Sequence, residues 1–159
     1  MTADGVAVTT RAGAVRAGAA ILTVSTAVLA GDALRLPSGA DPWREAAAAL
    51  PLGRNEKVFL EIGRDTAFEP DTHAYSNLHD PRSASYSIRP NGWPVIEAFF
   101  GGDGARIVEE EGPAAGLAPV SAELVALFGS DVASAVRSLA ATSWIRMASI
   151  GGAYSCALP

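Results

Sequence analysis

The sequence predicts an α+β fold in which helices flank a mixed sheet, and three observations support this prediction. Short apolar or alternating segments recur along the chain between Gly, Pro and Asn turns, as strands do. Helical segments interrupt these strands at irregular intervals, which argues against a regular βαβ winding. With 159 residues, of which 49% are hydrophobic, the chain can bury the core of one domain or slightly more.

The N-terminal part predicts a hairpin that leads into a buried strand, over residues 4–26. Valines alternate with small or polar neighbours at its start, and residues 10–13 supply a short turn. Residues 19–24 are rich in strand-forming side chains and provide the buried strand. The uncharged run over residues 17–31 is shorter than the about 20 apolar residues of a membrane-spanning helix, so we expect no contact with a membrane.

A signal peptide over residues 1–30 is the alternative interpretation of this region. Arg11 and Arg16 precede the apolar run, and residues 27–30 resemble a small-residue cleavage site. A leader that already contains a hairpin pattern is unusual, so the buried strand is favoured and a cytoplasmic protein is expected. A small secreted domain, processed after Ala30, stays open.

A helix and a strand follow in the middle of the chain. Asp41 as N-cap and Pro42 at the first helical position predict a helix over residues 43–50, which ends before Pro51. Residues 56–62 predict a strand. Its alternation places Val58, Leu60 and Ile62 on one face, and Lys57, Phe59 and Glu61 on the other.

The second half of the chain predicts further strands and helices after a polar, irregular loop over residues 63–83. The predicted elements are strands at residues 84–88 and 95–100 around a turn at 90–92, a turn at 101–104, helices at 105–110, 121–128 and 132–140, and an extended tail from residue 143.

Composition and spacing exclude several classes of function. The net charge is −5 and the 12 basic residues are scattered, so we expect no nucleic-acid partner. Cys156 is the only cysteine, which excludes an internal disulfide framework and a multi-cysteine metal site. His73 and His79 lie in the polar loop without the spacing of metal ligands, so no metal is expected.

Two segments carry patterns that could support chemistry. Lys57, the only lysine, lies near the start of an apolar strand, where an unpaired buried ammonium is costly. The simpler interpretation is that Lys57 extends to water from the strand edge. Trp144 is followed by Gly-Gly-Ala-Tyr at residues 151–154, and glycines there would let the backbone approach a flat group closely. The simpler interpretation of this second segment is a strand with a core tryptophan.

Four segments, in this order along the chain, resemble the flavin-dependent monoamine oxidase family. They are residues 19–29 (AAILTVSTAVL), 51–62 (PLGRNEKVFLEI), 93–105 (WPVIEAFFGGDGA) and 143–159 (SWIRMASIGGAYSCALP). The resemblance implies a substrate domain with adjoining strands of the FAD-binding domain. It divides the chain into residues 1–36, which resemble part of the FAD-binding domain, residues 37–140, the substrate-binding domain, and residues 141–159, which return toward the FAD-binding domain.

The resemblance also implies roles for individual residues. Lys57 falls on the family lysine that hydrogen-bonds through a water to the flavin N5, and Trp144 on a tryptophan packed beside the flavin. Tyr154 falls on one wall of the aromatic cage around the substrate amine, so Lys57 and Tyr154 are the expected catalytic residues. Gly152 and Ala153 join them as cofactor-binding residues. Covalently flavinylated members carry cysteine at the position of Ala153, so non-covalent FAD is expected here.

The chain also departs from the family pattern. It contains no G-x-G-x-x-G sequence, which the family uses to place the FAD pyrophosphate at a helix N-terminus. The glycine-glutamate segment and the second cage aromatic of the family have no counterpart here. We therefore expect a fragment of an amine oxidase that does not retain FAD alone and that lacks its FAD-binding segments or self-associates. A catalytically inactive, truncated remnant is the alternative, and the identity of the amine stays open.

Overall fold

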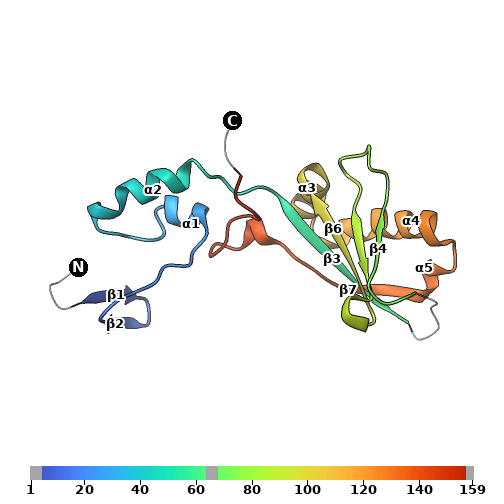
Figure 1. The fold of residues 1–159 in the computed structure, drawn as a ribbon, viewed down its shortest axis with the longest axis horizontal. Helices are drawn as coiled ribbons and strands as arrows, with labels where there is room; N and C mark the ends of the chain where they lie inside the picture. Colours follow the sequence, from blue (N-terminus) through green and yellow to red (C-terminus); the bar gives the residue numbers. More distant parts are fainter. Residues whose placement is uncertain (1–4, 64–67, 157–159) are drawn as a thin grey trace.

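The computed structural model describes residues 5–63 and 68–156, and three parts can be distinguished (Figure 1). Residues 5–50 form an N-terminal arm, and residues 55–141 form a body around a five-stranded sheet. Residues 142–156, here called the C-terminal segment, run back from the body toward the arm. The molecule is consequently elongated, with the arm and the body at opposite ends.

The arm combines a hairpin with two helices. Strands β1 (Val6–Thr10) and β2 (Gly13–Ala17) pair antiparallel, as the sequence predicts. Helices α1 (Thr26–Ala30) and α2 (Asp41–Ala48) follow, with a single 3₁₀ turn, η1 (Ser38–Ala40), before α2. The predicted helix at residues 43–50 is therefore confirmed, although it begins at Asp41 and its N-cap is Ala40.

The buried strand predicted at residues 19–24 is wrong. These residues belong to no strand, and Ile21 and Leu22 are 90% and 52% exposed. The side chains have the composition of a buried strand, but among the described residues no other strand pairs with them. A strand needs such a partner, because its backbone groups form no hydrogen bonds within the segment.

The body is built on an antiparallel sheet. Its strands are β3 (Asn55–Ile62), β4 (Thr72–Tyr75), β5 (Ser85–Ile88), β6 (Val95–Gly101) and β7 (Val136–Ala141), in the spatial order β4-β5-β6-β3-β7. Every neighbouring pair of these strands is antiparallel. The α+β class is confirmed, whereas the expectation of a mixed sheet is wrong, because the described strands include no parallel pair.

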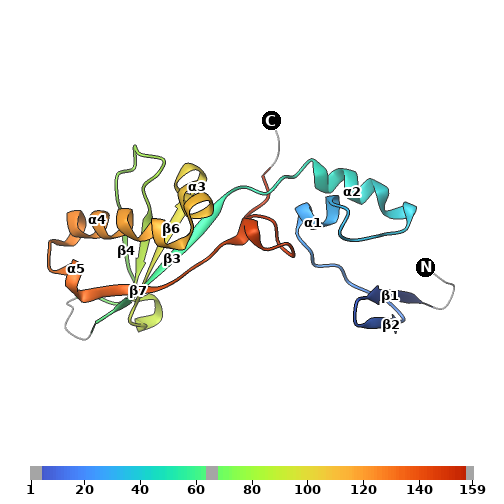
Figure 2. The ribbon, with the colours of Figure 1, turned by 180° about the vertical axis from the view of Figure 1, so that it is seen from behind.

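Helices cover one face of this sheet. They are α3 (Gly102–Glu111), α4 (Leu117–Phe128) and α5 (Val132–Ala135), and they lie on the side of the sheet that faces the viewer in Figure 2. Short 3₁₀ turns connect or follow these elements: η2 (Pro90–Gly92), η3 (Pro113–Gly116) and η4 (Trp144–Arg146).

The core lies between the helices and the sheet. The alternation predicted for β3 is confirmed, because Val58, Leu60 and Ile62 are buried in this core. The other members come from neighbouring strands and helices and include Tyr86, Ile88, Ile96, Ala98, Phe100, Val108, Val120 and Leu124. Since burial of a large apolar side chain contributes about 1.5–3 kcal/mol, this cluster stabilises the body.

Three predicted elements of the body need correction. Residues 101–104 are not a plain turn, because α3 begins at Gly102 directly after β6. Of the predicted helix at 132–140, only the first four residues are helical, and the rest is β7, which pairs with β3. The loop at residues 63–83 contains β4 and with it His73, while its residues 64–67 lie outside the described residues.

The predicted extended tail from residue 143 is also wrong for most of its length. Residues 144–146 form η4, and turns follow up to residue 150. One antiparallel bridge, between Leu52 and Ser155, is the extended pairing found in the described part of this tail. Residues 157–159, the end of the segment that resembles the oxidase family, lie outside the described residues.

Candidate functional site

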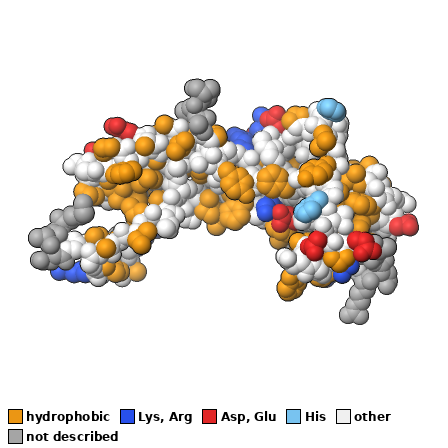
Figure 3. Space-filling view, viewed as in Figure 1, with side chains coloured by type: hydrophobic (Ala, Val, Ile, Leu, Met, Phe, Trp, Pro, Cys, Tyr) orange, Lys and Arg blue, Asp and Glu red, His pale blue; other side chains and the backbone are white. Residues whose placement is uncertain are grey.

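The face of the sheet opposite the helices, here called the open face, carries the side chains between the core positions. Cross-strand register places two rows of them side by side across the sheet: Tyr75, Ser85, Phe99 and Lys57 in one row, and His73, Ser87, Glu97 and Phe59 in the next. Figure 3 looks onto this face and shows hydrophobic, charged and histidine side chains together. The open face therefore combines aromatic surface with ionisable groups.

Lys57 forms an ion pair with Glu97 on the open face. The Lys57 Nζ lies 2.7 Å from the Glu97 Oε1, and the two side chains are 29% and 26% exposed. Phe99 is the direct cross-strand neighbour of Lys57, and Phe59 is that of Glu97. The only lysine of the chain is thus held by a carboxylate between two aromatic residues, instead of extending alone into water.

The run that leads into β3 pairs with the end of the C-terminal segment. The Gly53 N–H donates to the Tyr154 carbonyl over 2.8 Å, and the Ala153 N–H donates to the Gly53 carbonyl over 3.0 Å. The Cys156 N–H donates to the Pro51 carbonyl over 2.9 Å. These hydrogen bonds bring the backbone of Tyr154 next to a residue only four positions before Lys57.

A second connection joins the C-terminal segment to the strand of Lys57. The Thr142 hydroxyl donates to Glu56 Oε2 over 2.6 Å, and the Trp144 N–H donates to Glu56 Oε1 over 2.8 Å. The Lys57 N–H donates to the Thr142 hydroxyl over 2.8 Å, and the Thr142 N–H donates to the Lys57 carbonyl over 2.9 Å. Glu56 is 0% exposed. We call this connection the Glu56–Thr142 link.

The predicted site residues of the C-terminal segment differ in exposure. Trp144, the first residue of η4, is half-buried, and Ala153 is half-buried as well. Gly152 is buried with φ of 153°, and a Cβ there would lie 2.6 Å from the Leu52 Cβ, so the position requires glycine. The Tyr154 side chain is 71% exposed.

A second buried carboxylate lies near Glu56. Glu109 of α3 accepts from Arg54 over 3.0 Å, and the Arg146 guanidinium donates to the Glu109 carbonyl. Burial raises the pKa of the Glu109 carboxyl, the Arg54 cation opposes this shift, and the nearby Glu56 charge adds to it. The C-terminal segment is therefore also attached to α3.

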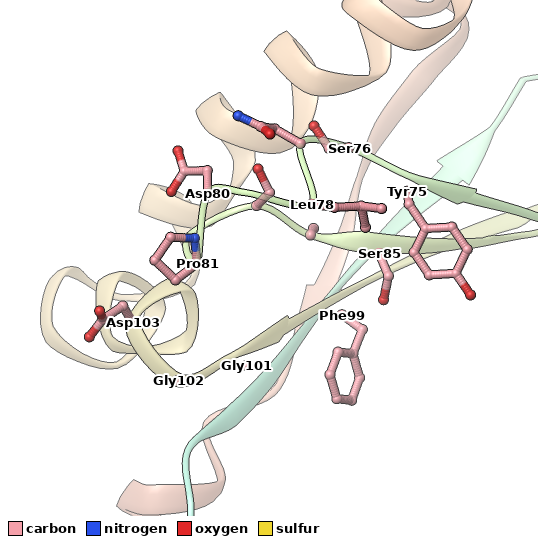
Figure 4. Close-up of a pocket in the computed structure, with 13 residues that line it drawn as sticks. Tyr75, Ser76, Leu78, Asp80, Pro81, Ser85, Phe99, Gly101, Gly102 and Asp103 are labelled. Carbon is pink, nitrogen blue, oxygen red and sulfur yellow. The ribbon is translucent and has the colours of Figure 1, made fainter.

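A surface cavity of about 420 Å³ adjoins the row of Lys57 (Figure 4). Tyr75 and Phe99 line one end of it, and Asp80 and Asp103 lie at the other end, with Leu78 between them. Hydrogen bonds from Arg82 hold the pKa of the Asp80 carboxyl below its usual value. The cavity has an apolar, aromatic end and an acidic end, which suits a ligand with an apolar body and a cationic group.

Sequence reasoning missed four residues of this region: Glu56, Glu97, Glu109 and Thr142. Only Glu56 had a local signal, because the alternation of residues 58, 60 and 62 extends back to place residue 56 on the core face. A charged residue at a core position needs a partner. Glu97 and Thr142 come next to Lys57 through pairing of distant strands, and Glu109 comes near Glu56 through the packing of α3 against β3. The sequence pattern specifies neither arrangement.

The described residues contain no group of three His, Cys, Asp or Glu side chains placed to hold a metal ion. Among the helices of that same part, none is long and apolar enough to cross a membrane.

No protein-family model matches the chain, and no curated protein is significantly similar to it. The fold and the open face define an α+β protein whose antiparallel sheet is covered by helices on one side. The likeness to the monoamine oxidase family therefore rests on the four sequence segments.

Proposed function

We propose that this chain is the substrate-binding part of a flavin-dependent amine oxidase, with FAD bound non-covalently and an amine as substrate. One observation carries the proposal. The two segments that most resemble flavin-contacting segments of the family are hydrogen-bonded to each other, at Gly53–Tyr154 and at Glu56–Trp144. Chain segments that lie far apart in sequence thus meet at the start of β3.

The side chains around Lys57 suit the flavin ring of FAD better than its pyrophosphate. Asn55 is 5% exposed, and its side-chain Nδ2 has no hydrogen-bond partner among the described residues. Since Asn55 precedes Lys57 by two positions on the same strand, both side chains belong to the open face. By contrast, the glycine-rich start of α3 carries Asp103, whose charge would repel a phosphate.

The proposed roles follow from these positions. FAD, when bound, supplies the acceptor for the hydride of the amine and is reoxidised by O₂ with release of H₂O₂. The Lys57 ammonium would hold a water and favour negative charge near the reacting centre. Tyr154 would flank the substrate amine, and the cavity beside Phe99 would accept the apolar body of the substrate. A cytoplasmic location belongs to the same proposal.

An inactive remnant is the second candidate, and the exposure of the arm favours it. Val15 and Ile21 are 61% and 90% exposed, so apolar surface is available for self-association. A signal peptide over residues 1–30 is less well supported. The Ser25 hydroxyl donates to the Ile150 carbonyl over 2.6 Å, and the Thr26 hydroxyl donates to the Leu50 carbonyl over 2.7 Å, so this region is bonded to distant parts of the chain.

The test is made on a polypeptide that joins this chain to a dinucleotide-binding segment with a G-x-G-x-x-G turn. We expect amine-dependent H₂O₂ production, which Lys57→Met lowers by about 10²-fold because it removes the cation beside the reacting centre. Tyr154→Ala is expected to lower it by a smaller factor. Turnover at the wild-type level in both variants contradicts the proposed roles.

Arg137→Met is the matched control for Lys57→Met. Arg137 belongs to the same sheet and pairs with Glu61 over 2.5 Å, so this variant also removes a paired cation. We expect peroxide production in Arg137→Met to remain at the wild-type level. The chain without the added segment is expected to purify without FAD, and stoichiometric flavin absorbance in that preparation would contradict this expectation.

A further inference from the structure

Glu56 is a fully buried carboxylate with an unusual set of partners. Its two oxygens accept hydrogen bonds from the Thr142 hydroxyl and the Trp144 N–H, and both donors belong to the C-terminal segment. The described residues include no cation within ion-pair distance of Glu56, because Arg54 pairs with Glu109 instead. Glu56 therefore depends on donors from one distant segment for its stabilisation.

The burial of this charge calls for a role other than packing. A buried carboxylate is expensive to desolvate, and an apolar side chain of similar volume would fill the same space at less cost. What an apolar side chain cannot do is fix the position of a hydroxyl and a backbone N–H at once. A buried carboxylate with two directed hydrogen bonds fixes the geometry of the groups that it contacts.

Thr142 extends this fixed geometry to Lys57. Its hydroxyl donates to Glu56 and accepts from the Lys57 N–H, and its own N–H donates to the Lys57 carbonyl. The backbone of Lys57 is consequently held on the side of β7 by Thr142, while its side chain is held on the open face by Glu97. Trp144 is fixed by the same carboxylate, two residues further along the chain.

We propose that Glu56 is the positioning residue that holds Trp144 directly, and the backbone of Lys57 through Thr142, in one fixed arrangement. The consequence for catalysis rests on the proposed function, in which both residues contact the flavin. The positioning itself is a property of the chain and can be measured without FAD.

The first test measures amide hydrogen exchange of Trp144 by NMR in the ¹⁵N-labelled chain. The exposed tryptophans, Trp43 and Trp93, are replaced by Phe. Trp144 is then the only tryptophan of the chain, and the measured signal is that of its backbone N–H. In this background, Thr142→Val keeps the shape of the side chain but removes the hydroxyl. We expect Trp144 exchange to accelerate about tenfold, with little change at core amides such as that of Leu60.

Two further variants separate positioning from general stability. Thr142→Ser restores the hydroxyl, so exchange at Trp144 should return to within about twofold of the parent. Tyr86→Phe removes the other hydroxyl–carboxylate hydrogen bond of the core, which Tyr86 donates to Glu123 over 2.5 Å. It should destabilise the body without a selective effect at Trp144.

The outcomes against the proposal are specific. Unchanged Trp144 exchange in Thr142→Val overturns it, and so does an equal acceleration of all core amides, because that result describes loss of stability alone. If Thr142→Val does not fold, Glu56→Gln serves as the second variant. It removes the charge but keeps the shape, and it should also accelerate exchange at Trp144 selectively.

The same variants can be assayed in the polypeptide completed with a dinucleotide-binding segment. Misplacement of groups beside the reacting centre should lower kcat more than it changes KM in Thr142→Val, and Thr142→Ser should restore kcat. If the completed wild-type polypeptide produces no peroxide with any amine, the proposed function fails. The exchange experiment on the chain alone still decides whether Glu56 positions Trp144.

Discussion

The arm and the body both contain strand-forming, apolar segments, yet they bury them very differently. In the body, side chains from β3, β5, β6 and the helices meet in one continuous core. In the arm, both strands of the hairpin are almost wholly exposed, and Ala47 is the one residue there, within the described range, that is buried.

The difference shows that apolar segments form a core only where a second layer of secondary structure packs against them. The helices α3 and α4 provide this layer for the body: α3 follows β6 directly, α4 follows α3 after η3, and both contribute buried side chains to the core. The hairpin of the arm has no such layer among the described residues, and an isolated two-stranded hairpin is marginally stable in water. We therefore expect mutations in the two regions to have different effects.

The largest difference is expected between two leucines. Leu60 in β3 is 2% exposed, whereas Leu22 in the arm is 52% exposed. Leu60→Ala removes buried apolar area and leaves a cavity, so the free energy of unfolding should fall by about 2–5 kcal/mol. Leu22→Ala should change it by less than about 0.5 kcal/mol. Urea unfolding followed by circular dichroism measures both.

Equal effects of the two leucine substitutions would contradict the comparison. If Leu22→Ala destabilises as much as Leu60→Ala, the arm must be covered in solution, for example by a second copy of the chain. Sedimentation of the wild-type chain at two concentrations separates these cases, because a covered arm would give a mass above 16.3 kDa.

A smaller difference is expected between two glycines. A Cβ at Gly116 would lie 2.9 Å from methyl groups of Val108 and Val58, whereas a Cβ at Gly18 would meet nothing within 4 Å. Gly116→Ala should destabilise the body by about 1–3 kcal/mol, because the core is already filled. Gly18→Ala should be neutral or stabilise by about 0.4–1 kcal/mol through the unfolded chain.

Thermal unfolding of the two alanine variants provides the measurement. The midpoint should fall in Gly116→Ala and stay at or above the wild-type value in Gly18→Ala, which is the matched control because it makes the same chemical change in the arm. Equal midpoints for both variants would show that the side chains of Val108 and Val58 move aside without cost.

The body could largely be predicted from the sequence because its patterns are local. The alternation of residues 56–62 predicts the two faces of β3 correctly, and Gly129 marks the end of α4 correctly. The prediction failed where pairing with a distant segment determines the secondary structure. Residues 136–141 form β7 only because β3 pairs with them, and residues 19–24 form no strand because no partner pairs with them among the described residues.

The candidate site was predictable only in part, for the same reason. Lys57 stands out as a single lysine on an apolar strand, and Gly152 as part of a glycine pair. Glu97 and Thr142 look ordinary in the sequence, and they gain their roles from the register of β6 and β7 against β3. Whether Lys57, Trp144, Gly152, Ala153 and Tyr154 contact a flavin stays a prediction.

The last expected effect is on the pH dependence of stability, and it comes from Tyr86 in the core of the body. Burial raises the pKa of the Tyr86 phenol above its ordinary value of 10, and the hydrogen bond to the Glu123 carboxylate raises it further. The folded chain therefore keeps this proton at a pH where the unfolded chain loses it. The stability that this group contributes is fully present below pH 10 and falls as the pH rises above it, by about 1.4 kcal/mol per pH unit.

Urea unfolding at a series of pH values from about 8 to 11 should show the free energy of unfolding falling with this slope above pH 10. Tyr86→Phe should remove the part of the slope that Tyr86 causes, because Phe has no proton to lose. Tyr154, 71% exposed in the C-terminal segment, is the matched control, and Tyr154→Phe should leave the slope as it is. A slope unchanged by Tyr86→Phe would mean that the alkaline loss of stability arises outside the core of the body.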